Sequence, residues 1–193
     1  MAPNLSRCAT LCLLSTTFIS CYYAGIAAQD RPERSAAGPP TATDVVVRTE
    51  PWHLVHIPDP VARRATIAAL ETTSTRLANA GCRNILTDFE DRAGRSLAER
   101  LSDTGVDIQS YVAMVTFMDD TRNRQCSSGI LAFTVPGSRV VRVCVDELKR
   151  IQREEAPEYL VAVFIHEILH TLGLGEAPPS SREITARVRA RCG

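Results

Sequence analysis

The chain has 193 residues, a length that suits one domain of ordinary size and is too short for two full-sized domains. Its 22 basic side chains balance 22 acidic ones, whereas a nucleic-acid-binding protein normally has a basic excess or a clustered basic face. Hydrophobic residues make up 45% and charged residues 23% of the sequence, ordinary globular values that exclude wholesale disorder. We therefore expect a folded domain that binds no nucleic acid.

The first 27 residues have the features of a secretory signal. Arg7 precedes a mostly apolar run from Ala9 to Ala28, and small residues lie near the end of that run. Hydroxyl side chains within the run make it a poor membrane-spanning helix, so we expect no stable membrane span after processing. Two alternatives stay open, because the four residues that end at Cys21 resemble a degenerate lipobox: lipidation of that cysteine, or an uncleaved anchor.

Residues 28–43 combine proline, glycine, serine and mixed charge without periodicity, which predicts a flexible leader. We expect one folded domain over residues 44–193. Together with the signal, this organisation predicts an exported chain, secreted or located in the periplasm or cell envelope, with a lipid anchor as the alternative. The sequence predicts no oligomeric state.

The first part of the domain is predicted to be mainly helical. Asp44–Arg48 has the composition of a short strand. Asp59 is an N-cap residue followed by proline, which starts a helix with one apolar face, and we expect Gly81 to end that helix. A shorter helix is predicted over Ser96–Ser102.

The middle of the domain changes to the pattern of strands. Three segments rich in valine, isoleucine, phenylalanine and threonine are bounded by turn residues. They are Tyr111–Met118, Ile130–Val135 and Arg139–Val145. Residues 136–138, Pro-Gly-Ser, predict a hairpin turn between the last two. The order of elements predicts an α+β fold with a short antiparallel sheet.

The last part is predicted to return to helices. Asp146–Arg153 indicates a short helical turn, and Pro157–Leu172 is the most apolar stretch of the domain and predicts a buried helix. Ser180 and Glu183 have the spacing of a capping box, which predicts a final helix that runs toward Arg191.

Four of the seven cysteines remain after the predicted signal is removed, an even number that predicts two disulfides in an exported chain. Three pairings are possible, and we favour Cys126–Cys144 across the hairpin, which leaves Cys82–Cys192. A zinc site built from all four thiolates is the alternative, but no two of them have the C-x2-C spacing that such sites use.

The predicted buried helix contains His166-Glu167-Ile168-Leu169-His170. Two histidines four residues apart lie on one helix face, so both imidazoles can bind one metal ion. Glu167 is offset by about 100° from His166, which suits a general base beside the metal and not a ligand. Random placement of the histidines and glutamates of this chain produces about 0.005 such motifs, so we interpret it as a metal site.

A catalytic zinc site needs a third protein ligand. Gly173 can adopt the left-handed conformation that ends the helix and turns the chain back toward the metal, which places Glu176 to coordinate. His53 and His56 are the alternatives for that third position, or for substrate binding.

Residues 166–176 read H-E-x-x-H-x-x-G-x-x-E, which resembles the extended motif of metzincins with Glu176 in place of the third histidine. The resemblance to zincin metallopeptidases implies a small zincin-like domain with a buried active-site helix, a Zn2+ cofactor and a peptide or protein substrate. The chain departs from metzincins, since no methionine follows Met118 and no tyrosine follows Tyr159. A carboxylate ligand is more like gluzincins, which supply it from a separate helix, so no single family is identified.

We therefore expect an exported zinc metallopeptidase in which His166, His170 and Glu176 bind Zn2+ and Glu167 is the general base for attack by a metal-activated water. Donors to the tetrahedral intermediate are not identified; the candidates are Tyr111, Tyr159 and Arg139. Either of the last two predicted strands can pair with substrate at a sheet edge. The alternatives are a non-catalytic zinc-binding envelope protein and a structural lipoprotein without metal.

Overall fold

The computed structural model of the chain describes Trp52 and residues 54–193. These residues form a mixed α+β fold of seven α-helices, two 3-10 helices and one four-stranded sheet, which confirms the predicted fold class. The predicted signal over residues 1–27, the leader over residues 28–43, the strand Asp44–Arg48 and the candidate ligand His53 lie outside the described residues.

The sheet is mostly parallel. Its strands are β1 (Val55–His56), β2 (Thr116–Asp119), β3 (Ala132–Thr134) and β4 (Val140–Val143). In the strand order β1-β2-β4-β3, the first two pairs are parallel and only the β3–β4 pair is antiparallel. The expected antiparallel sheet is therefore wrong outside the predicted hairpin. The chain passes through several helices between β1 and β2, and such crossovers are what parallel pairing requires.

The predicted strand Tyr111–Met118 is wrong in its first half. Ile108–Ala113 forms the helix α4, and only the end of the segment enters β2. The carboxylate of Asp107 accepts a hydrogen bond from the backbone N–H of Ser110 and so starts a helix there. Tyr111 is buried on one side of this helix. Packing of this kind outweighs the preference of the segment's residues for strands.

The long helix α1 (Pro60–Ala78) starts as predicted, because Asp59 accepts hydrogen bonds from two backbone N–H groups of its first turn. It ends before the expected residue. Asn79 leaves the helical conformation and its side chain then caps the short helix α2 (Ala80–Arg83). Gly81 therefore lies inside α2, so its expected role as the stop of α1 is wrong.

The other helical predictions are confirmed. Capping boxes start both α3 (Leu97–Ser102) and α7 (Ser181–Cys192), the latter through the predicted pair Ser180 and Glu183. The remaining helices besides α6 are α5 (Val145–Glu154) and the 3-10 helices η1 (Asn84–Thr87) and η2 (Arg124–Ser128).

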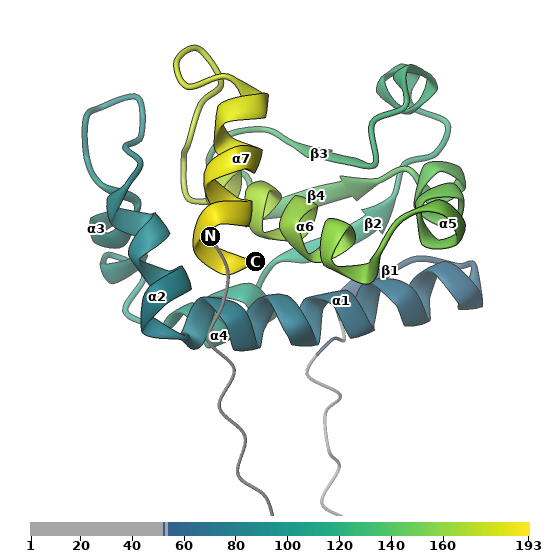
Figure 1. Cartoon of the computed structure of the whole chain (residues 1–193), viewed down its shortest axis with the longest axis horizontal. Helices are drawn as coiled ribbons and strands as arrows, with labels where there is room; N and C mark the ends of the chain where they lie inside the picture. Colours follow the sequence, from purple (N-terminus) through teal and green to yellow (C-terminus); the bar gives the residue numbers. More distant parts are fainter. Residues whose placement is uncertain (1–51, 53) are drawn as a thin grey trace, which may run out of the picture. The chain divides into compact units, whose positions relative to one another are not determined.

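Helix α6 (Pro157–Thr171) lies at the centre of the packing. It contacts α1, α7, α5 and the strands β3 and β4 (Figure 1). Phe164 is fully buried, with its ring centroid 5.2 Å from that of Phe117 on β2. A helix held on several sides in this way gives the side chains of its last two turns fixed positions.

Both predicted disulfides are present, Cys82–Cys192 and Cys126–Cys144. The first joins α2 to the last residue of α7 across 110 positions of sequence. Disulfides are compatible with an extracellular location, since they persist in oxidising compartments. Among the described residues, no helix has both the length and the apolar character needed to cross a membrane.

Candidate metal centre

Two imidazoles and one carboxylate converge near the end of α6. The Nε2 atoms of His166 and His170 are 2.8 Å apart, and Oε1 of Glu176 lies 3.3 Å from the first and 3.2 Å from the second. In a tetrahedral zinc site, bonds of about 2.0–2.2 Å place neighbouring ligand atoms about 3.3–3.6 Å apart. The two distances to Oε1 of Glu176 are close to that spacing, whereas the distance between the two nitrogen atoms is shorter. This group can hold one metal ion.

The hydrogen bonds on the outer side of each ring favour a cation at the centre. Nδ1 of His170 lies 2.8 Å from the backbone carbonyl of Leu174, which can only accept, so this nitrogen carries a proton, and in the neutral form of the ring that binds a metal Nε2 then keeps a lone pair. Nδ1 of His166 lies 2.9 Å from Oγ1 of Thr185. The carboxylate of Glu176 is also an acceptor. Lone pairs directed at one point fit a bound cation.

Local backbone geometry brings Glu176 back to the helix. Gly173 has a φ of +113°, in the region that favours glycine, as the sequence predicts. Its N–H donates to the carbonyl of His170, and the next residue, Leu174, forms a β-bridge with Asp91. A side chain at Gly173 would have its Cβ 3.3 Å from that of Asp91. The turn therefore depends on glycine both for its conformation and for space.

The centre is buried on the helix side and open on the carboxylate side. His166 and His170 are 5% and 4% exposed, whereas the side chain of Glu176 is 49% exposed. Burial, together with the neighbouring His170, lowers the pKa of His166 to about 4, so this imidazole is neutral at physiological pH. A neutral imidazole is the form that binds a metal. Of the three side chains, only that of Glu176 is substantially exposed to solvent.

The carboxylates of Glu176 and Glu167 differ in environment. Burial opposes ionisation of Glu176, but His170, His166 and the Ser181 hydroxyl together lower its pKa. Burial, assisted by the charge of Glu176, raises the pKa of Glu167 to about 8. Glu167 is 5% exposed, and within the described residues its Oε2 atom has no hydrogen-bond partner. A buried acidic group without a partner needs a nearby cation to remain ionised.

The alternative ligands do not join this group. His56 lies in β1 at the opposite edge of the sheet from β3, and His53 lies outside the described residues. Over residues 54–193, the group of His166, His170 and Glu176 is the one set of three histidine, cysteine or acidic side chains compact enough for a metal. The four thiolates that formed the other alternative are paired in disulfides.

The three candidate donors for a tetrahedral intermediate have other contacts. The hydroxyl of Tyr111 is buried and donates to Oγ1 of Thr171 at 3.1 Å, and the guanidinium of Arg139 lies 5.5 Å from the Tyr111 ring centroid. Tyr159 is in the first turn of α6, where Arg189 of α7 covers its ring at 5.2 Å. Among the contacts of the described residues, none joins these three candidates to the metal-binding group.

Strand β3 presents the open edge of the sheet next to α6. Strand β4 has partners on both sides, β2 and β3, and so cannot accept a further strand. Of the two segments predicted to pair with a substrate, only Ile130–Val135 therefore has an edge that no strand of the described residues occupies. Ile130 and Val135 flank this strand and are 39% and 67% exposed.

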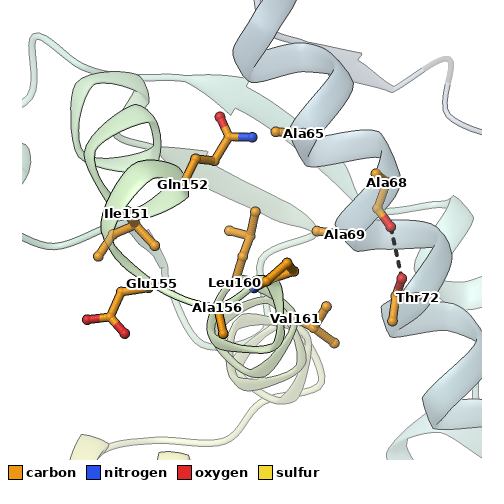
Figure 2. A pocket seen from close by; sticks show the side chains of 11 residues that line it. Ala65, Ala68, Ala69, Thr72, Ile151, Gln152, Glu155, Ala156, Leu160 and Val161 are labelled. Atoms are coloured by element: carbon orange, nitrogen blue, oxygen red, sulfur yellow. Dashed lines mark hydrogen bonds between the residues drawn. The ribbon is translucent and has the colours of Figure 1, made fainter.

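A separate hollow of about 320 Å³ lies at the other half of α6, between α1 and α5 (Figure 2). Its lining is mostly alanine and aliphatic side chains, with Gln152, Glu155 and Thr72 as its polar members. It contains none of the metal-binding side chains. This hollow is therefore separate from the candidate metal centre.

Neither partner of the two imidazole Nδ1 atoms was predicted from the sequence. Leu174 takes part through its backbone carbonyl, which any residue at that position supplies. Thr185 lies 19 residues after His166, and no local spacing connects the two. The C-terminal helix is predicted from the sequence, and one of its faces packs on α6. A threonine on that face is the sequence signal that could have indicated this contact.

Comparisons with known proteins add no relative: a scan against family models, a search of curated proteins and a search of solved structures each found no match to this chain. The resemblance to zincins therefore extends no further than the motif over residues 166–176.

Proposed function

We propose that this protein is an exported zinc-dependent metallopeptidase. The observation that carries the proposal is the convergence of His166, His170 and Glu176 next to Glu167, a buried carboxylate with an unpartnered oxygen. A group that only bound a structural metal would have no use for such a carboxylate beside it.

The donor set favours zinc. Two imidazole nitrogens and one carboxylate oxygen are ligands that zinc accepts, and three protein ligands leave a fourth position for water or substrate. A zinc ion held in this way lowers the pKa of water toward neutrality and polarises a carbonyl group. The exposed side of Glu176 provides the access that a substrate needs.

Glu167 is the proposed general base. It follows His166 directly and lies on the same buried part of α6. A neighbouring cation favours the ionised carboxylate and so opposes the rise of its pKa that burial causes. The ionised carboxylate accepts a proton from the attacking water and delivers it to the departing amine.

The free edge of β3 is the proposed binding surface for the peptide substrate. An extended peptide can add to an open sheet edge through main-chain hydrogen bonds. Ile130 and Val135, exposed at the two ends of this edge, offer apolar contacts to its side chains. This arrangement favours a substrate in extended conformation with apolar residues near the cleaved bond.

The test is cleavage of a mixed peptide library by the purified protein with and without a zinc chelator. Glu167→Gln keeps the size of the side chain but removes the base, so we expect it to lower cleavage at least about 100-fold while zinc stays bound. Glu158→Gln, at an exposed position of the same helix, is the matched control and should cleave normally. Cleavage at an unchanged rate by Glu167→Gln would contradict the assignment.

A non-catalytic zinc-binding protein of the cell envelope is the second candidate. It is favoured by the lack of contact between the metal-binding group and the candidates Tyr111, Tyr159 and Arg139 among the described residues. Zinc bound at one ion per chain, with no peptide cleaved from the library, would support this candidate over a peptidase.

A further inference from the structure

We infer that Thr185 is a positioning residue of the metal centre, which orients the imidazole of His166 for a divalent metal ion and makes the C-terminal helix α7 part of the site. The inference rests on the proposed metal-binding function. It concerns a residue that lies outside the motif and that contacts a ligand without binding the ion itself.

The geometry of the contact is specific. Oγ1 of Thr185 lies 2.9 Å from Nδ1 of His166, while Nε2 of the same ring points at His170 and Glu176. A neutral imidazole carries one proton, and a ring that offers Nε2 to a metal carries it on Nδ1. This N–H then donates to the threonine hydroxyl, which fixes both the tautomer and the rotation of the ring.

Helix α7 is fastened firmly enough for this role. Ile184, which precedes Thr185, is fully buried. At the far end of the helix, Cys192 forms the disulfide with Cys82, and its carbonyl accepts a hydrogen bond from Nη1 of Arg76 at 2.8 Å. These contacts hold the threonine hydroxyl in place relative to α6, which packs directly against α7 (Figure 1).

The same face of α7 contacts a second ligand. Ser181 is four residues before Thr185, so the two hydroxyl side chains lie one above the other on the helix. The hydroxyl of Ser181 interacts with the carboxylate of Glu176. Two of the three ligands are therefore approached by side chains of one helix turn, as expected if α7 supports the centre and does not merely cover it.

The test is the affinity of the full chain for Zn2+, measured by competition with a chromophoric chelator. Thr185→Val keeps the shape of the side chain but removes the hydroxyl, and we expect it to weaken zinc binding by about 10- to 100-fold. Thr185→Ser restores the hydroxyl and should bind within about 3-fold of the wild type, allowing for the lost methyl group. Thr75→Val, an exposed helical threonine bonded only to its own helix, is the matched control and should bind normally.

Substitution by Co2+ supplies a readout that a purely structural role would not move. The visible absorption of bound Co2+ should change in Thr185→Val, because one imidazole is no longer fixed, and should stay as in the wild type in Thr75→Val. Circular dichroism of the metal-free variants verifies that each is folded.

The outcomes separate this inference from the proposed function. Wild-type zinc affinity and an unchanged Co2+ spectrum in a folded Thr185→Val would overturn the role of Thr185 and leave the metal centre intact. A wild-type chain that binds no zinc would overturn both. Weakened binding in Thr185→Val with recovery in Thr185→Ser would support the inference even if the protein cleaves no peptide.

Discussion

His166 and His170 lie one turn apart on the same helix, yet different parts of the chain hold them in place. The Nδ1 atom of His170 is hydrogen-bonded to the backbone carbonyl of Leu174, four residues later in the chain. The Nδ1 atom of His166 is hydrogen-bonded to the hydroxyl of Thr185, which lies on a separate helix. One ligand is thus secured by local backbone and the other by tertiary packing.

Residues 166–176 therefore contain only part of what positions the candidate metal centre. The turn at Gly173 is closed mainly by hydrogen bonds within residues 168–174, with a β-bridge from Leu174 to Asp91 as a longer-range addition. The position of Thr185 requires α7 to be docked, and the disulfide Cys82–Cys192 connects that helix to α2. Perturbing the two supports separately should therefore produce different effects.

The largest effect is expected from the disulfide that holds α7. Replacing Cys82 and Cys192 by serine should lower the free energy of unfolding by about 4–5 kcal/mol, because the bond closes a loop of more than 100 residues. Zinc affinity should fall as well, since Thr185 is no longer held. Urea unfolding and chelator competition measure the two quantities.

The second disulfide is the matched control for this prediction. Cys126–Cys144 closes a shorter loop, with a sequence separation of 18, and should contribute about 3 kcal/mol. Its removal should leave the zinc affinity of the folded protein unchanged. Equal losses of zinc affinity in the two double variants would contradict a special role for α7.

The next effect concerns Glu167, which lies between the two histidines in sequence and whose Oε2 atom has no hydrogen-bond partner among the described residues. Its pKa of about 8 in the metal-free fold lies above the ordinary value of 4.5 for this side chain. The unfolded chain therefore loses this proton at lower pH than the folded chain does, and metal-free stability should decrease as the pH rises from about 4.5 to about 8.

Glu167→Gln removes this titration and should make the metal-free protein more stable at pH 8 by an amount on the order of a few kcal/mol. Below pH 4.5 the wild type and the variant should have similar stability, because the carboxyl is neutral in both states. Chemical denaturation at a series of pH values, after chelator treatment, measures the difference. A difference that does not vary with pH would refute the assigned burial of the carboxyl.

The smallest effect is expected at the local support of His170. Gly173→Ala should cost about 1–3 kcal/mol and weaken zinc binding, because the positive φ strains alanine and its Cβ meets that of Asp91. Urea unfolding and zinc competition measure both.

Gly94→Ala provides the comparison, since Gly94 also has a positive φ, of +75°, but nothing lies within 4 Å of an added Cβ. It should be destabilised by about 1 kcal/mol with no change in zinc binding. If both glycine variants bound zinc like the wild type, the turn would not position His170.

Features with local physical causes could be predicted from the sequence. Asp59 and Ser180 start helices through side-chain hydrogen bonds within one turn, and the histidine spacing and Gly173 define the metal-binding group by local geometry. The two disulfides match the favoured one of three possible pairings, a choice that depended on the hairpin between Cys126 and Cys144 and that the cysteine count alone does not decide.

Features that depend on packing could not be predicted. The segment starting at Tyr111 has β-prone residues, but burial and the Asp107 cap make its first half helical. Parallel pairing of β1 and β2 depends on the helices between them. Thr185 contacts His166 only because α7 packs on α6, and no local residue spacing predicts that contact.

We propose that His166, His170 and Glu176 bind one zinc ion. The most direct test is the metal content of the purified protein, determined by mass spectrometry of the elements, for the wild type and for His170→Ala. We predict about one zinc ion per wild-type chain and a loss of most of it in the variant. A wild-type chain without metal, or a variant that retains the full amount, would contradict zinc binding by these three side chains.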